Sequence, residues 1–226
     1  RQSRYLRDGA CGITMNNTTA DYRSLYDFWF GVGDLDDAAH ASARMDVWFN
    51  TNPDYDDLLR ERFSTTVAEA ANGGCEHWQQ TLRGSLSYVI LLDQIPRNLY
   101  RGSAQAFAYD ASALATSRAT LAHFDVTQLR LIELMFLYMP FEHAEDIDAQ
   151  ETCVASYRGM HDRAPSHLRG VIAELVQAGE DHRAVIQRFG RFPHRNRALG
   201  RNSTPEELAW LTSHHGWGQN IIPTDP

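Results

Sequence analysis

The sequence SLSYVILLDQIPRN, residues 85–98, decides the fold class. Leu86, Val89 and Ile90 follow the i, i+3, i+4 spacing of one helical face, and Asp93 takes the next place on that face. Pro96 has no backbone N–H and forbids continuation of the regular hydrogen-bond ladder. We therefore predict a helix over about 76–95 that buries its apolar face and carries a carboxylate there.

Helical periodicity continues along the chain, and no stretch of period-two alternation rich in β-branched residues is convincing. Pro140 is expected to separate two helices, and Gly179 to lie between two shorter ones. Further helices are predicted over about 21–30, 40–49, 53–72, 104–123, 127–138, 141–160 and 204–215. We predict an all-α fold of about eight to ten helices in a compact array, with 1–18 as a flexible leader or non-native remnant and 19–226 as one helical domain.

Composition narrows the function classes. The 226 residues carry a formal net charge of −8, so the chain repels phosphate backbones and anionic lipids, and we expect neither nucleic acid nor a membrane as partner. The absence of lysine excludes Schiff-base and P-loop lysine chemistry. Three cysteines without a CxxC pair favour a reducing compartment. No apolar run of about 18 residues occurs. We expect a cytoplasmic protein and leave its oligomeric state open.

Polar side chains on helix faces that are predicted to be buried are the candidate residues of a functional site. A buried charge normally has an ion-pair or hydrogen-bond partner inside the protein, so such residues occur in groups. Asp93 is the first, with Arg97 four residues on as its nearest candidate partner. In the helix predicted over 141–160, His143 and Gln150 share a stripe with apolar residues. Both side chains are expected to find hydrogen-bond partners inside the protein.

A second group of polar residues begins at His182, which lies on the apolar face of its predicted helix. That helix runs into a loop with four cationic or ionisable side chains within seven residues, Arg191, His194, Arg195 and Arg197. This pattern predicts a local anion trap on an acidic protein. We expect the DQIPRN, FEHAED and GRFPHRN phrases to converge, with a histidine within about 4 to 6 Å of a carboxylate, a range that favours the charged imidazole.

Each feature also has a structural interpretation. A single buried Asp more often forms an ion pair or caps a helix than acts as a catalyst. A His that points inward is usually a hydrogen-bonded core residue. An arginine-rich loop is also typical of a solvated surface or of a clamp on neighbouring carboxylates. The GxSxG, HExxH and GxxxxGKS motifs are missing. Glu142 and His143 are adjacent rather than three apart, so we expect neither a tightly bound metal nor a cofactor. Cys153 is expected to be a buried, inert thiol.

Five phrases occur in chain order between about Tyr22 and Leu211: FWFG, LLDQIPRNLYRG, AFAYD, FLYMPFEHAEDIDAQ and DHRAVIQRFGRFPHRNRALGRNSTPEE. Together they resemble the bacterial family known as domain of unknown function 924. The resemblance implies a tetratricopeptide-like helical fold and no established activity. The family pattern has a Ser where Ala144 stands, so no role of that hydroxyl beside His143 carries over. The polar residues identified from helical periodicity lie within these phrases.

Two functions fit these observations. In the first, the chain binds a small anionic or polar metabolite and is a cofactor-independent hydrolase or lyase. Its catalytic residues would be His143, Glu142, Asp93 and His182, and its ligand-binding residues Gln94, Arg97, Asn98, Arg191, His194, Arg195 and Asn196. In the second, the chain is a helical-repeat module that binds a peptide, and its buried polar groups only fix helix packing. The concentration of His, Glu, Asp and Arg in three short phrases favours the first function, whereas the lack of a complete catalytic signature favours the second.

Overall fold

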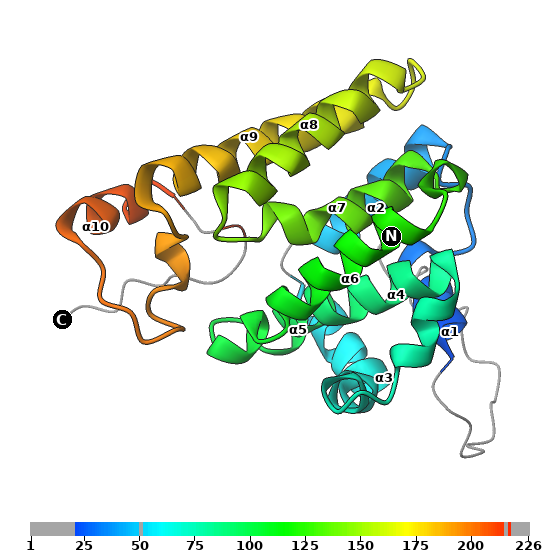
Figure 1. The fold of residues 1–226 in the computed structure, drawn as a ribbon, viewed down its shortest axis with the longest axis horizontal. Coiled ribbons are helices and arrows are strands. Elements are labelled where there is room, and N and C mark those ends of the chain that lie inside the picture. The colour runs from blue at the N-terminus through cyan, green and yellow to red at the C-terminus, as the bar shows by residue number, and fades with distance from the viewer. Residues whose placement is uncertain (1–20, 50–51, 215–216, 218–226) are drawn as a thin grey trace.

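The computed structural model describes residues 21–49, 52–214 and 217 (Figure 1). Within these ranges the chain forms helices and no strand, which confirms the all-α prediction. The α-helices are α1 (Tyr22–Phe30), α2 (Ala38–Phe49), α3 (Pro53–Ala71), α4 (Leu82–Asp93), α5 (Ile95–Leu99), α6 (Asp110–His123), α7 (Leu131–Glu142), α8 (Ile147–Arg163), α9 (Arg169–Phe189) and α10 (Pro205–Leu211). The predicted leader, 1–18, lies outside the described residues. No helix of the described part has the length and apolar character needed to cross a membrane.

Local signals place several helix starts where the sequence predicts them. Asp21 accepts a hydrogen bond from a backbone N–H in the first turn of α1, and Asn52 does so for α3, which has Pro53 as its first residue. Thr204 and Glu207 cap α10 reciprocally, each side chain bonding the backbone N–H of the other. These bonds satisfy N–H groups that have no partner inside their own helix.

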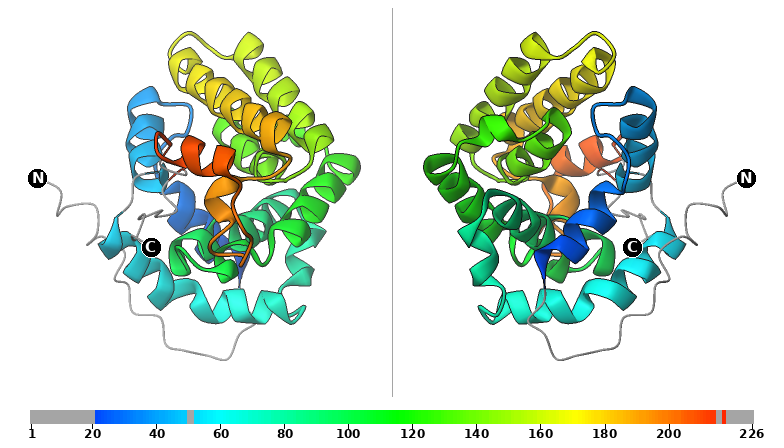
Figure 2. Two further views of the ribbon diagram at one scale, coloured as in Figure 1. Left: turned by 90° about the vertical axis from the view of Figure 1, so that its left-hand side faces the viewer. Right: turned by 90° about the vertical axis from the view of Figure 1, so that its right-hand side faces the viewer.

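The central helix of the molecule is α4, which packs against α1, α6 and α7. Every residue from Gly84 to Asp93 is buried. A helix that is surrounded on all sides reads as a continuous apolar run, which explains the strength of this signal in the sequence. Helices α8 and α9 form a long hairpin along one side of the molecule, with α10 beyond the end of α9 (Figures 1 and 2). The tetratricopeptide-like detail stays a prediction.

The expected helix break at Pro140 is wrong. Helix α7 continues through Pro140 to Glu142, and α8 begins only at Ile147 with Asp146 as its cap. Proline removes one backbone donor here, the N–H that would otherwise bond the carbonyl of Phe136, and the helix ends two residues later. The His143 N–H still donates to the carbonyl of Met139 and closes the last turn. Glu142 therefore ends one helix instead of beginning the next.

The prediction of two short helices around Gly179 is also wrong, because α9 is one helix of 21 residues. Gly179 lies buried where α9 crosses α8, and a β-carbon built there would approach Cδ2 of Tyr157 to 3.2 Å. The missing side chain lets the two helices pack closely. The tertiary contact thus outweighs the weak helix propensity of glycine, which costs about 1 kcal/mol relative to alanine.

Four further segments have boundaries that differ from the predicted ones. The segment predicted over 76–95 divides into a 3₁₀ helix (Glu76–Gln80) and α4, and Pro96 then lies in the first turn of α5. The helices expected over 104–123 and 127–138 likewise begin with 3₁₀ turns at Ala104–Phe107 and Val126–Gln128. Helix α10 ends at Leu211 because the hydroxyls of Thr212 and Ser213 bond its last carbonyls.

Candidate functional site

The end of α4 meets the end of α7 in a buried pair formed by Asp93 and His143. Asp93 is 0% exposed, and its two carboxylate oxygens lie 2.8 and 2.9 Å from Nδ1 of His143. Arg97 lies 3.5 Å away, which confirms the prediction of a buried Asp93 near an arginine. Burial opposes ionisation, but His143 and Arg97 outweigh it and lower the pKa of Asp93 below its ordinary value. Gln94 adds an amide hydrogen bond to the ionised carboxylate.

His143 follows the last residue of α7, and its side chain is 15% exposed. Burial, followed by the charge of Arg97, lowers the pKa of His143 in spite of Asp93. The imidazole is therefore neutral at pH 7, and the adjacent carboxylate places the ring proton on Nδ1. No described residue hydrogen-bonds Nε2. Within the described part of the chain the lone pair of Nε2 is therefore free to accept a proton, the arrangement of a general base held by a carboxylate.

Next to this pair lies a second acid and histidine, Glu142 and His182. Nδ1 of His182 is 3.0 Å from Glu142 Oε1 and 2.8 Å from the carbonyl oxygen of Ala178, and Tyr157 donates to Glu142 Oε2 at 2.9 Å. Burial raises the pKa of Glu142 to about 7. Burial also lowers the pKa of His182 to about 3. Glu142 thus holds its proton close to neutrality, while the histidine stays uncharged.

The expectation that a nearby carboxylate charges these histidines is wrong. Both contacts are shorter than predicted, yet the loss of hydration disfavours the imidazolium more than the carboxylates favour it. Burial likewise lowers the pKa of His194, whose Nδ1 is buried with no partner among the described residues. The three imidazoles lie around one centre: the His143 and His182 ring centroids are 6.3 Å apart, and Trp217 packs against His182 and His194.

Two arginines border the histidines and share one carboxylate. Arg97 forms a bidentate pair with Asp110 at 2.9 and 3.1 Å, and Arg195 contacts the same side chain at 3.0 Å. The guanidinium of Arg195 lies between the rings of Phe107 and Phe192. Burial lowers the pKa of Arg195 to about 10, so it remains charged at neutral pH. The three predicted phrases therefore converge around Asp93, His143, His182, Arg97 and Arg195.

Sequence reasoning missed Asp110, Tyr157 and Trp217. Asp110 opens α6, and a carboxylate in the first turn of a helix has an ordinary explanation in the helix dipole. Tyr157 follows the same helical spacing as the apolar residues of the helix predicted over 141–160, so its hydroxyl gives no separate signal. The only available signal for Asp110 was its place in the AFAYD phrase, which the resemblance had already set apart.

Other predicted ligand-binding residues do not join this centre. Arg191 forms a bidentate pair with Glu207 at 2.7 and 2.9 Å, and Asn196 bonds the same carboxylate. Asn98 donates instead to Asp56 in α3. The loop after α9 is thus in part a clamp on carboxylates, as the structural interpretation of an arginine-rich loop predicts. This finding removes Arg191 from the expected anion trap.

A thiol and a metal site are the remaining chemical features considered near the centre. Cys153 is buried, and burial raises its pKa well above the ordinary value, which agrees with an inert thiol. Among the described residues no three His, Cys, Asp or Glu side chains are placed to hold a metal ion. The absence of a metal and of a cofactor in the working protein stays a prediction.

Comparison with known proteins adds a family and no activity. No functionally curated protein matches the sequence. The fold is similar to the solved structure of a protein of unknown function from Agrobacterium tumefaciens, with a TM-score of 0.71 and 30% sequence identity over 85% of this chain and 97% of that one. The model of the family described as bacterial protein of unknown function (DUF924) matches residues 25–215. The chain therefore belongs to this DUF924 family.

Proposed function

We propose that the protein is a cytoplasmic, cofactor-independent acid–base enzyme, a hydrolase or a lyase, that acts on a small anionic or polar metabolite. The observation that carries this proposal is the state of His143. Its imidazole is neutral, Nδ1 is held by the ionised Asp93, and Nε2 has no hydrogen bond to a described residue. This combination provides a base at neutral pH and a carboxylate that stabilises the imidazolium once the proton has moved.

Glu142 supplies the complementary acid. Its pKa of about 7 leaves a large protonated fraction at neutral pH, whereas Asp93 is fully ionised. Two carboxyl groups whose environments drive their pKa values apart are typical of paired acid and base roles. In this proposal His143 withdraws a proton from substrate or water, and Glu142 returns one to the leaving group. His182, in contact with Glu142, connects the two sides of the centre.

Arg97 and Arg195 would bind the anionic group of the substrate. Their guanidinium groups converge on Asp110, whose side chain is 20% exposed. An incoming carboxylate or phosphate that reaches this position competes with Asp110 for the same donors, and guanidinium groups match such anions in shape as well as charge. The substrate class is therefore a small acid or phosphate ester with a proton to lose or a bond to hydrolyse.

Thermal unfolding with inorganic phosphate, sulfate, succinate and citrate tests the proposal. A ligand that binds only the folded state at a hundredfold excess over its Kd stabilises it by about 2.7 kcal/mol, equivalent to roughly 5 to 10 °C in Tm for a chain of this size. We expect at least one anion to raise Tm, Arg195→Ala to abolish the effect, and Arg191→Ala, the matched control from the same loop, to retain it.

The opposite result would support the helical-module alternative. There, no anion shifts the unmutated protein, and Arg195→Ala lowers Tm in plain buffer because it leaves Asp110 with fewer partners. Equal loss of the anion effect in both arginine variants would also contradict the proposal, since Arg191 lies outside the centre and is bound to Glu207.

A further inference from the structure

Glu145 and Arg201 form an ion pair beside the acid–base centre. Glu145 lies in the connection between α7 and α8, two residues after His143. Two guanidinium nitrogens of Arg201 donate to the two carboxylate oxygens of Glu145, at 2.6 and 2.9 Å. Burial acts to raise the pKa of Glu145, but the hydrogen bonds from Arg201 and from a backbone N–H outweigh it and hold this pKa below its ordinary value. The carboxylate is therefore ionised at neutral pH.

The pair encloses the backbone of Phe192, in the loop after α9. The N–H of Phe192 donates to Glu145 Oε1 at 2.8 Å, and its carbonyl oxygen accepts a hydrogen bond from Arg201 at 3.2 Å. The same carbonyl accepts the backbone N–H of Arg195 at 3.1 Å, across the 3₁₀ turn Pro193–Arg195. Both polar backbone groups of Phe192 are thus fixed by one ion pair.

The side chain of Phe192 carries this restraint into the centre. Its ring is fully buried. The guanidinium carbon of Arg195 lies 4.5 Å from the ring centroid, and the ring centroids of His182 and His194 lie 5.6 and 5.4 Å from it. Because a protein interior is closely packed and transmits strain, a shift of Phe192 would displace these three side chains.

The ion pair therefore joins two parts of the centre that are distant in the sequence. Glu145 follows His143 closely along the chain, and Phe192 precedes Arg195 and is hydrogen-bonded to it. The exposed fractions of the two side chains are 24% for Arg201 and 25% for Glu145. An ion pair that water reaches adds little net stability, so its bonds to the Phe192 backbone are the more informative feature.

We infer that Glu145 and Arg201 are positioning residues, which act through Phe192 to hold Arg195 and His182 in place relative to the base His143. This inference rests on the proposed function, in which Arg195 binds the anionic group of the substrate. A displacement of about 1 Å caused far from the reacting atoms can slow an enzyme about a hundredfold. The pair fixes the separation between the anion-binding arginine and the base.

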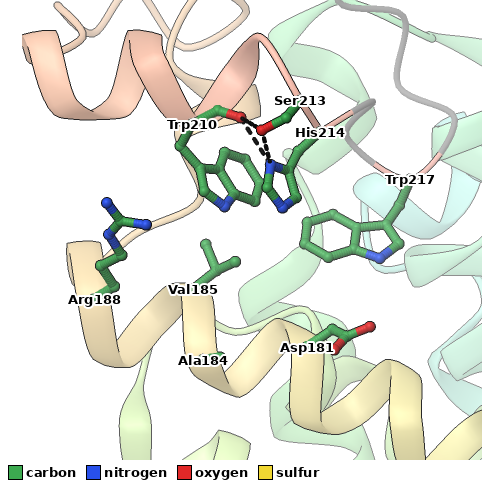
Figure 3. A pocket seen from close by; sticks show the side chains of 8 residues that line it. All are labelled: Asp181, Ala184, Val185, Arg188, Trp210, Ser213, His214 and Trp217. Carbon is green, nitrogen blue, oxygen red and sulfur yellow. Dashed lines mark hydrogen bonds between the residues drawn. The ribbon is translucent and has the colours of Figure 1, made fainter.

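Arg188 and Glu206 provide a matched control pair. Nε and one terminal nitrogen of Arg188 donate to a carboxylate oxygen of Glu206, at 2.9 and 2.8 Å. Arg188 lines a pocket between α9 and the residues from Trp210 onward, and the lining of this pocket includes none of the acid–base groups (Figure 3). In the described part of the chain neither member of the pair is bonded to the backbone of Phe192.

NMR spectra of the full chain report the position of the Phe192 ring, because its ring current acts on the imidazole C–H resonances of His182 and His194. We expect Glu145→Ala to shift both resonances and Glu206→Ala to leave them unchanged. Glu145→Gln should restore them, since the amide oxygen can accept the two hydrogen bonds that Oε1 accepts now. A pair that only stabilises the fold would lower Tm without moving these resonances, and that result would overturn the inference.

Calorimetric titration with inorganic phosphate extends the test to anion binding. We expect Glu145→Ala to weaken phosphate about tenfold or more, whereas Glu145→Gln and Glu206→Ala should bind it within about threefold of the unmutated protein. Undiminished affinity in the alanine variant overturns the inference. If Glu145→Ala does not fold, Arg201→Met takes its place with the same expected and opposing results, because it keeps a long stem and removes the donor to the Phe192 carbonyl.

The two measurements separate this inference from the proposed function. Shifted histidine resonances in a protein that binds none of the anions named above would support the positioning of Phe192 and contradict the acid–base enzyme. Equal phosphate affinity in the unmutated protein and in Glu145→Ala would refute the positioning alone.

Discussion

The protonation of Glu142 gives the sharpest prediction, and Glu142→Gln is the change that tests it. Burial raises the pKa of Glu142 from an ordinary 4.5 to about 7 in the folded state. The folded protein then holds a proton that the unfolded chain releases between pH 4.5 and 7. Stability from this group is fully present below pH 4.5 and is lost as the pH rises through 7.

The size of this loss follows from the two pKa values. At roughly 1.4 kcal/mol for each factor of ten in the dissociation constant, the interval from 4.5 to about 7 corresponds to about 3 kcal/mol. The neutral amide that Glu142→Gln introduces would mimic the protonated acid at every pH. The variant should therefore match the unmutated protein near pH 4.5 and exceed its stability by about 3 kcal/mol at pH 8.

His182 works in the opposite direction and must be separated from this effect. Its pKa falls from 6.5 to about 3, so the unfolded chain binds the extra proton and stability rises as the pH increases from 3 to 6.5. The difference between the variant and the unmutated protein removes most of this contribution, because both proteins contain His182. The comparison is more informative than either pH profile alone.

Urea denaturation at pH 5 and pH 8, with the m-value fitted at each pH, measures the difference. A gap between the two proteins that does not change with pH would mean that Glu142 titrates as an ordinary carboxyl. A variant that is less stable than the unmutated protein at pH 8 would mean that Glu142 is ionised and paired with a protonated His182. Either result refutes the assignment of a neutral acid beside a neutral histidine.

Three further predictions concern other parts of the centre and the fold. Asp93→Ala should lower the free energy of unfolding by about 3 kcal/mol in urea titrations. This value is at the lower end of the cost of breaking a buried pair, because Arg97 retains its ion pair with Asp110. A loss below about 1 kcal/mol would contradict the pairing of Asp93. Diethylpyrocarbonate should modify His143 almost as fast at pH 6.5 as at pH 8, since its lowered pKa keeps the imidazole unprotonated; peptide mass spectrometry measures the rate, and a steep fall in rate between pH 8 and pH 6.5 refutes it. Gly179→Ala should cost about 1 to 3 kcal/mol through overpacking against Tyr157, whereas a gain in Tm would show that helix propensity dominates there.

The sequence was sufficient to predict the features that depend on periodicity. Asp93 occupies the i+7 place of an apolar face, and a residue at that place on a fully surrounded helix has to be buried. The starts of α3 and α10 follow from Pro53 and from the reciprocal cap of Thr204, which act within one turn and need no tertiary information.

What the sequence did not predict depends on contacts between distant segments. Gly179 reads as a helix break until the ring of Tyr157 is placed against it, 22 residues earlier in the chain. Asp110 becomes a bridge between Arg97 and Arg195 only because α5, α6 and the loop after α9 meet. The pKa shift of the histidines was predicted in the wrong direction. Spacing in the sequence indicates a nearby carboxylate but does not measure how much water the fold removes from the imidazole.

Glu142 and His143 show how two neighbouring residues acquire opposite roles. They end α7 side by side, about 100° apart around the helix axis, so one side chain reaches α4 and the other reaches α8 and α9. A cation lies near Asp93, but the contacts of Glu142 are an uncharged phenol and a neutral imidazole. A role in packing alone would favour an ionised, well-paired acid or an apolar side chain, because Glu142 in its present state destabilises the fold above neutral pH. Groups whose pKa is shifted at a cost to stability are concentrated at functional sites, and this cost is the physical argument for assigning a proton-transfer role to the end of α7.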